Sequence, residues 1–84
     1  MDIAAVEAKV KEVVAKQLKV SADKVVPTAQ FVKDLGADSF ASIELVAAFE
    51  VAFDIEMEED SALSVKTVGD AIKFIKQACD AQGK

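Results

Sequence analysis

The chain has 84 residues, 52% of them hydrophobic and 30% charged, with a formal net charge of −5 at pH 7. This length and composition fit one globular domain, residues 1–84, and exclude a disordered or low-complexity chain. The single cysteine, Cys79, excludes an intrachain disulfide, and no segment approaches the ~20 apolar residues of a membrane-spanning helix. The first residues also lack the basic start and apolar core of a signal peptide. We therefore expect a soluble, cytoplasmic protein, and a monomer.

The charges are distributed unevenly along the chain. Residues 34–60 hold nine acidic residues and no basic residue, whereas residues 1–33 hold six lysines and four acids. A segment this acidic repels nucleic acid and anionic membranes and attracts basic protein surfaces. We therefore expect partners with basic docking patches, no nucleic-acid binding and no stable membrane insertion. Ordinary solubility is the alternative explanation of the acidic charge.

The first third of the chain predicts a helix followed by a long loop. Residues 3–18 carry apolar side chains at steps of three and four, which is typical of an amphipathic helix, and Asp2 is a suitable N-cap. Residues 20–37 show no clear period and contain Pro27 and Gly36, which favour turns. Because this first loop keeps several apolar residues, we expect it to pack against the bundle and to include a short helical turn.

A second helix is expected over residues 39–53, which no Gly or Pro interrupts. Either Asp38 or Ser39 can serve as its N-cap. The following segment, residues 54–66, is acidic and irregular, with one helical turn expected at residues 59–63.

The last helix is expected from Val68 to about Ala78, with Thr67 as its cap. Its inner, core-facing stripe consists of Val68, Ala71, Ile72, Ile75 and Cys79. These elements predict an all-α bundle of three main helices, one short helix and a long first loop. We expect Cys79 to be a small buried apolar residue rather than a reactive thiol.

Two apolar stripes run along the second helix, because successive helical residues turn by ~100°. The inner stripe consists of Leu45, Val46, Phe49, Ala52 and Phe53. The outer stripe lies on roughly the opposite side and consists of Phe40, Ile43, Ala47 and Val51, flanked by Glu44 and Glu50. An exposed apolar stripe beside acids is typical of a docking surface for another protein. The alternative is that the first loop folds over this stripe.

Autonomous catalysis has little support in these residues. The chain has no histidine, so neither a Ser-His-Asp nor a Cys-His arrangement can form, and no catalytic residue is expected. The alternate acids of residues 54–58 resemble the start of a calcium-binding loop, but Glu59 stands where that loop needs Gly. No metal site is therefore expected.

Ser39 has two interpretations. Serine is a preferred N-cap, so a purely structural role explains it. The free N–H groups and the dipole at the start of a helix also favour a phosphate ester there. A group attached to Ser39 would emerge beside Phe40 and the outer stripe. The residues alone leave both interpretations open.

Two stretches, DLGADSFASIELVAAFEVAFDIEM at residues 34–57 and TVGDAIKFI at residues 67–75, resemble the acyl carrier proteins of fatty-acid and polyketide synthesis. The similarity covers the whole chain and implies a four-helix acyl-carrier bundle. It implies a non-catalytic carrier with 4′-phosphopantetheine joined to Ser39 through a phosphodiester. The arm would hold acyl groups as thioesters for fatty-acid or related biosynthetic enzymes. The implied partners are the phosphopantetheinyl transferase and the acyl-processing enzymes. An unmodified protein-interaction module is the alternative.

The resemblance also implies roles for other residues. The docking residues would be Asp38, Phe40, Ile43, Glu44, Ala47, Glu50 and Val51. The acyl chain would shelter against Leu45, Val46, Phe49, Phe53 and Ile72, since each buried methylene contributes about 0.8 kcal/mol.

The chain departs from the usual pattern of the family in its docking helix. Phe40 replaces the usual Leu, and Ala41 stands where an acid is common. Val51 and Ala52 replace further acids, and Glu58 stands where Pro is common. We therefore expect recognition to depend more on apolar contacts than is usual. A carrier of a specialised pathway and a housekeeping fatty-acid carrier are both open interpretations.

Overall fold

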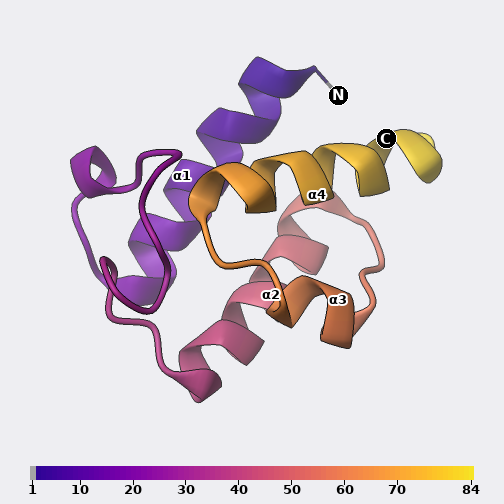
Figure 1. Ribbon diagram of the computed structural model, residues 1–84. Helices are drawn as coiled ribbons and strands as arrows, with labels where there is room; N and C mark the ends of the chain where they lie inside the picture. Colours follow the sequence, from indigo (N-terminus) through magenta and orange to yellow (C-terminus); the bar gives the residue numbers. More distant parts are fainter. Residues whose placement is uncertain (1) are drawn as a thin grey trace.

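Three long helices and one short helix make up the protein in the computed structural model, which describes residues 2–84 (Figure 1). In chain order the elements are α1 (Ile3–Leu18), the 3₁₀ turn η1 (Ala22–Lys24), α2 (Ser39–Phe53), α3 (Glu59–Leu63) and α4 (Val68–Ala81). The described residues contain no β-strand beyond one isolated bridge. The predicted all-α fold is therefore confirmed, including the helical turn within the first loop.

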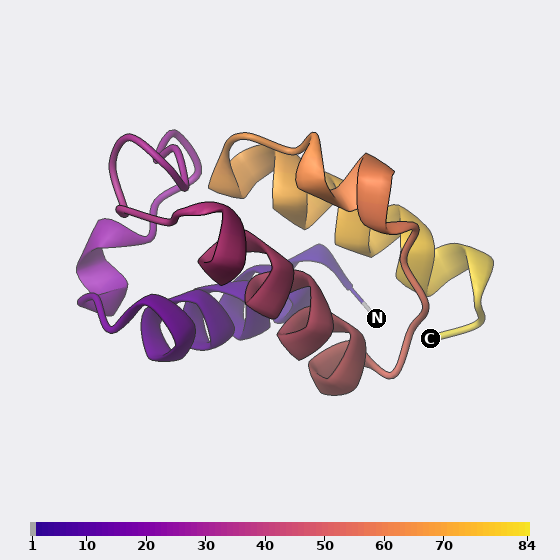
Figure 2. The same ribbon diagram turned by 90° about the horizontal axis from the view of Figure 1, so that it is seen from below.

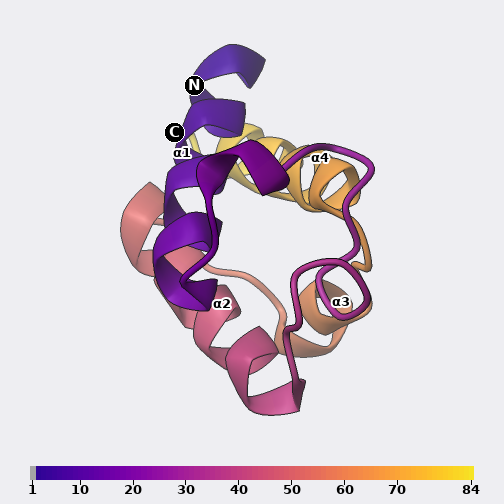
Figure 3. The same cartoon turned by 90° about the vertical axis from the view of Figure 1, so that its left-hand side faces the viewer.

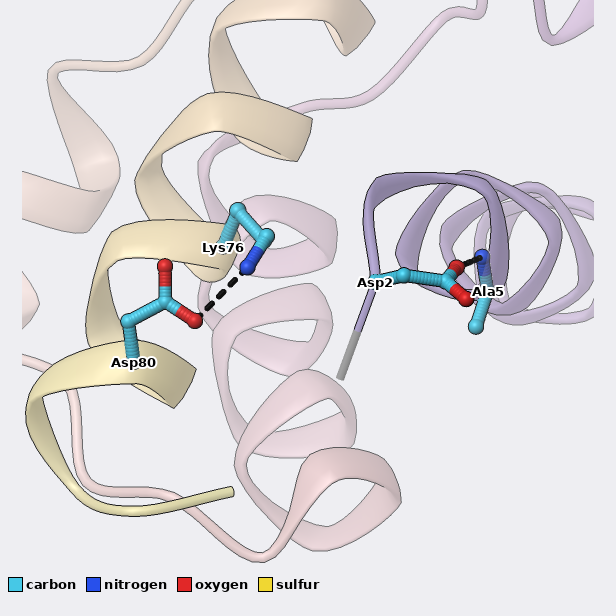
Figure 4. Close-up of polar contacts among 4 residues, drawn as sticks. All are labelled: Asp2, Ala5, Lys76 and Asp80. Atoms are coloured by element: carbon cyan, nitrogen blue, oxygen red, sulfur yellow. Dashed lines mark hydrogen bonds and ion pairs between the residues drawn. The ribbon is translucent and has the colours of Figure 1, made fainter.

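Capping residues fix both ends of α1. The backbone N–H of Ala5 donates to Oδ1 of Asp2 over 2.9 Å, so Asp2 is the N-cap that the sequence predicts (Figure 4). At the other end, Lys19 adopts the left-handed conformation with φ of 55°, and the N–H of Val20 donates to the carbonyl of Ala15. This arrangement satisfies carbonyls that the last turn would otherwise leave unpaired, so α1 stops there.

The last helix starts where expected but is longer than predicted. Thr67 is its N-cap, since its Oγ1 accepts the N–H of Asp70 over 3.1 Å. The sequence predicts an end near Ala78, whereas α4 continues to Ala81. One reason is the ion pair between Lys76 and Asp80, 2.7 Å long and one turn apart, which supports the final turn (Figure 4).

The end of α4 is tied to the segment between α2 and α3. The side-chain amide of Gln82 accepts the N–H of Glu56 and donates to its carbonyl, each over 2.8 Å. Nζ of Lys84 lies 2.7 Å from Oδ2 of Asp54. These contacts join the last residues of the chain to the start of the acidic connection, 26 to 30 positions earlier in the sequence.

The core lies between α1, α2 and α4 and is completed by the first loop. The loop contributes five buried residues, which are Val25, Ala29, Phe31, Leu35 and Ala37. An antiparallel bridge pairs Gln30 of the loop with Thr67 at the start of α4, and the N–H of Phe31 donates to the carbonyl of Lys66 over 3.0 Å. The loop therefore packs down as predicted, at one end of the bundle (Figure 3).

The loop and α4 approach each other closely at Gly69. A Cβ at this position would lie 3.0 Å from the carbonyl oxygen of Pro27, which accepts the Gly69 N–H over 2.9 Å. This approach explains why a glycine occupies the first turn of α4.

Seen from below, α1 and α2 pack side by side, and the first loop lies at the end opposite both termini of the described chain (Figure 2). No helix within residues 2–84 is both long enough and apolar enough to cross a membrane.

Candidate functional site

The start of α2 is built around Asp38 rather than Ser39. Oδ1 of Asp38 accepts the N–H of Ala41 over 2.8 Å, and its carbonyl accepts both the N–H and the hydroxyl of Ser42 over 2.9 Å each. Asp38 is therefore the N-cap, which decides between the two caps that the sequence allows. Ser39 is the first helical residue and is exposed. Its hydroxyl has no hydrogen-bond partner among residues 2–84.

The turn before α2 is anchored on both sides. Gly36 adopts φ of +72°, a left-handed conformation that side chains disfavour. The neighbours of this glycine, Leu35 and Ala37, are buried, and the N–H of Ala37 donates to the carbonyl of Phe31 over 2.8 Å. Asp34 closes the preceding turn, since its Oδ2 accepts the N–H of Gln30 over 2.7 Å. The segment thus holds the start of α2 in place while leaving its first residue in solvent.

The outer stripe of α2 is exposed. Phe40, Ile43 and Val51 expose 71%, 47% and 84% of their surface, and Ala47 is also exposed. The alternative, in which the first loop covers this stripe, is therefore wrong, because the loop packs against α4 instead. Large apolar side chains exposed together on one helix are typical of a surface that contacts another molecule.

The two acids that flank the stripe differ in their surroundings. Glu44 is exposed, whereas Glu50 is half-buried and its Oε2 accepts the N–H of Met57 over 3.1 Å. Glu50 thus also holds the connection that precedes α3. Glu44 borders a shallow groove between α1 and α2, which is lined by Val13, Lys16, Gln17, Glu44, Ala47, Ala48, Val51 and Ala52.

A cavity of about 350 Å³ opens on the other side of α2, between this helix, the first loop, α3 and α4. Its apolar wall consists of Phe31, Val32, Leu45, Val46, Phe49, Met57, Ala62, Leu63, Val65, Ala71, Phe74 and Ile75. Its polar wall consists of Gln30, Lys33, Ser42 and Lys66. A volume of this size is at the lower end of the range for small-molecule sites.

The cavity wall differs in part from the predicted pocket. Leu45, Val46 and Phe49 line the cavity, whereas Phe53 and Ile72 are not among its lining residues. Both are buried in the core. The ring of Phe53 instead lies beneath α1, with Nζ of Lys9 5.9 Å from its centroid.

Sequence periodicity missed the parts of the wall that lie outside the inner stripes. Phe74 and Met57 line the cavity, as do residues of the first loop and of α3. A large apolar side chain off the inner stripe of α4 was the available signal for Phe74. The contribution of the loop depends on its tertiary packing, which cannot be predicted from the helical periodicity of the sequence.

Asp54 lies at the opposite end of α2 from Ser39, and its pKa is shifted. The hydrogen bond from Lys84, together with its positive charge, lowers the pKa of Asp54. The described residues also contain no group of side chains arranged to hold a metal ion.

Comparison with known proteins agrees with this geometry. A family model described as a phosphopantetheine attachment site matches residues 8–75, which include the whole of α2 and the first loop. An acyl carrier protein from Sulfurovum sp. (strain NBC37-1) is 58% identical over 67 residues, covering 80% of this chain and 89% of that protein.

Fold and site together thus define a helical carrier domain that takes 4′-phosphopantetheine as its prosthetic group. Within that class, the chain belongs to the acyl carrier protein family.

Proposed function

We propose that this protein carries acyl groups as thioesters on a 4′-phosphopantetheine arm that is joined to the hydroxyl of Ser39 through a phosphodiester. The observation that carries the proposal is the state of this hydroxyl, which is exposed and makes no hydrogen bond in the described chain. Because Asp38 provides the cap, Ser39 can be modified without loss of a bond that holds α2 together.

The residues around Ser39 fit a phosphodiester. The first-turn N–H groups and the helix dipole favour a negative charge at this end of α2. The Asp38 carboxylate next to it already accepts the N–H of Ala41, which offsets part of its repulsion of a phosphate. When bound, the prosthetic group supplies a thiol that holds the acyl group as a thioester.

The cavity offers shelter to an acyl chain attached in this way. Leu45, Val46 and Phe49 form one wall, and Ser42 places the cavity one helical turn from Ser39. Since each buried methylene contributes about 0.8 kcal/mol, an aliphatic chain prefers this wall to water.

The outer stripe fits the docking of partner enzymes. Asp38, Glu44 and Glu50 would attract basic patches on the phosphopantetheinyl transferase and on the acyl-processing enzymes. The exposed side chains of Phe40, Val51 and their neighbours would supply apolar contact. The proposed destination is fatty-acid synthesis or a related, specialised pathway, since Val51 and Ala52 stand where the family pattern commonly has acids.

Intact-mass measurement tests the attachment. Incubation with coenzyme A and a phosphopantetheinyl transferase should add one arm to the wild type and none to Ser39→Ala. Ser42→Ala, which removes the other hydroxyl of α2, is the matched control and should still gain one arm. An unmodified wild type would support a docking module without a prosthetic group, and a modified Ser39→Ala would exclude Ser39.

A further inference from the structure

The cavity wall carries a charge opposite to that of the chain. The chain has a net charge of −5, yet the lining residues include two lysines, Lys33 and Lys66, and no aspartate or glutamate. The chain as a whole has fifteen acidic and ten basic residues, so the sign of the charge on this cavity differs from that of the whole chain.

Contacts between backbone segments hold both lysines on the same cavity. Lys33 lies in the first loop and Lys66 lies just before α4. The two segments are joined by the Gln30–Thr67 bridge and by the bond from the N–H of Phe31 to the carbonyl of Lys66. The backbone segments that carry the two lysines are therefore joined to each other by hydrogen bonds.

Neither lysine is neutralised within the described part of the chain. Both are exposed, and the ion pairs found there use Lys76 and Lys84 instead. The acid next to Lys33 in sequence, Asp34, uses one carboxylate oxygen to accept the N–H of Gln30. The exposed acids of the neighbouring helices, Glu59, Asp60 and Asp70, do not line the cavity.

From this charge pattern we propose that Lys33 and Lys66 bind a carboxylate on the acyl cargo. The protein thus favours acyl groups that carry a carboxylate a few carbons from the thioester over neutral groups of equal length. A carboxylate does not enter the apolar interior unpaired, because the cost of removing its water is too large. It stays at the rim, where two ammonium groups replace part of its hydration. This inference rests on the proposed carrier function.

A matched pair of cargoes tests the inference. The transferase loads the protein with a ¹³C-carboxyl-labelled glutaryl group or a pentanoyl group, both five carbons long and attached through an amide, which resists cleavage. The pKa of the glutaryl carboxylate is then measured by NMR titration on the protein and on the free pantetheine amide. Lysines favour the ionised form, so we expect the pKa to be lower on the protein by about half a unit.

Charge-matched variants separate the rim from the general field of the protein. Lys33→Gln with Lys66→Gln should abolish the shift, and Lys33→Glu with Lys66→Glu should raise the pKa above that of the free amide. Lys24→Gln with Lys73→Gln removes the same charge from exposed positions outside the cavity and should keep the shift.

Three results would overturn the inference. One is an equal pKa on the protein and on the free amide, and another is an equal effect of both glutamine double variants. The third concerns the Lys33→Gln/Lys66→Gln variant: its phosphodiester ³¹P signal changes with both cargoes, while the pKa of the glutaryl carboxylate stays as in the wild type. That result would assign the lysines to the arm. Intact mass is recorded first, and a wild type that takes no arm would overturn the carrier function itself together with its cargo site.

Discussion

Replacing Asp38 by Ala removes the side-chain oxygen that caps α2 and tests the division of roles between Asp38 and Ser39. In the structure this oxygen lies 2.8 Å from the N–H of Ala41, whereas the hydroxyl of Ser39 bonds to no described residue. Loss of an N-cap costs about 1 kcal/mol. For a domain of this size that lowers Tm by roughly 4–8 °C.

Two further variants make the measurement specific. Asp38→Asn keeps the capping geometry and removes the charge, so its stability should stay within about 0.5 kcal/mol of the wild type, because Asn and Asp cap helices equally well. Ser39→Ala should also stay within about 0.5 kcal/mol, since it removes an exposed group without a partner.

Thermal and urea denaturation followed by circular dichroism gives the free energy of unfolding of all four proteins. The reasoning fails if Ser39→Ala loses as much stability as Asp38→Ala, because Ser39 would then be the cap. It also fails if Asp38→Asn and Asp38→Ala unfold alike, since the charge rather than the capping bond would then stabilise α2.

Three other predictions concern docking, the cavity and the end of α2. Phe40→Leu combined with Ala41→Asp should speed processing by ordinary fatty-acid enzymes, and unchanged steady-state rates would count against a specialised docking surface. An attached acyl chain should shift the NMR signals of Phe49 while the buried face of α1 keeps its signals; no change at Phe49 would mean that the cargo stays outside. Because Lys84 lowers the pKa of Asp54, the ionised pair stabilises the fold above the unfolded pKa of Asp54, and this contribution is lost as the pH falls through its folded value. Lys84→Gln should raise the pKa of Asp54 in an NMR titration, and an unchanged value would contradict the pairing.

The sequence predicted helices well where local signals agree. The bounds of α2 follow from a segment without Gly or Pro between two turn segments, and both predicted ends match the structure. The predicted end of α4 was too early, because its last turn is supported by the ion pair between Lys76 and Asp80 rather than by further apolar periodicity. The cap of α2 stayed undecided, since aspartate and serine are equally good at that position.

Tertiary packing limited the prediction of the cavity. Helical periodicity identified the wall that α2 supplies, including Leu45 and Phe49. It did not indicate that Phe53 turns towards α1, nor that Val32 and Lys33 of the first loop would reach the cavity. Such contacts depend on how an irregular segment packs, and no local pattern in the sequence encodes that.

The bridge between Gln30 and Thr67 has a consequence for how the chain folds. It joins segments that lie far apart in the sequence, so forming it costs more loop-closure entropy than forming any helix of the bundle. Contacts between near neighbours in the sequence form faster, so α1 and α2 should take shape while this connection is still open. The cavity beside α2 would then form after the helices, and a newly made chain could not shelter an acyl chain until the bridge had closed.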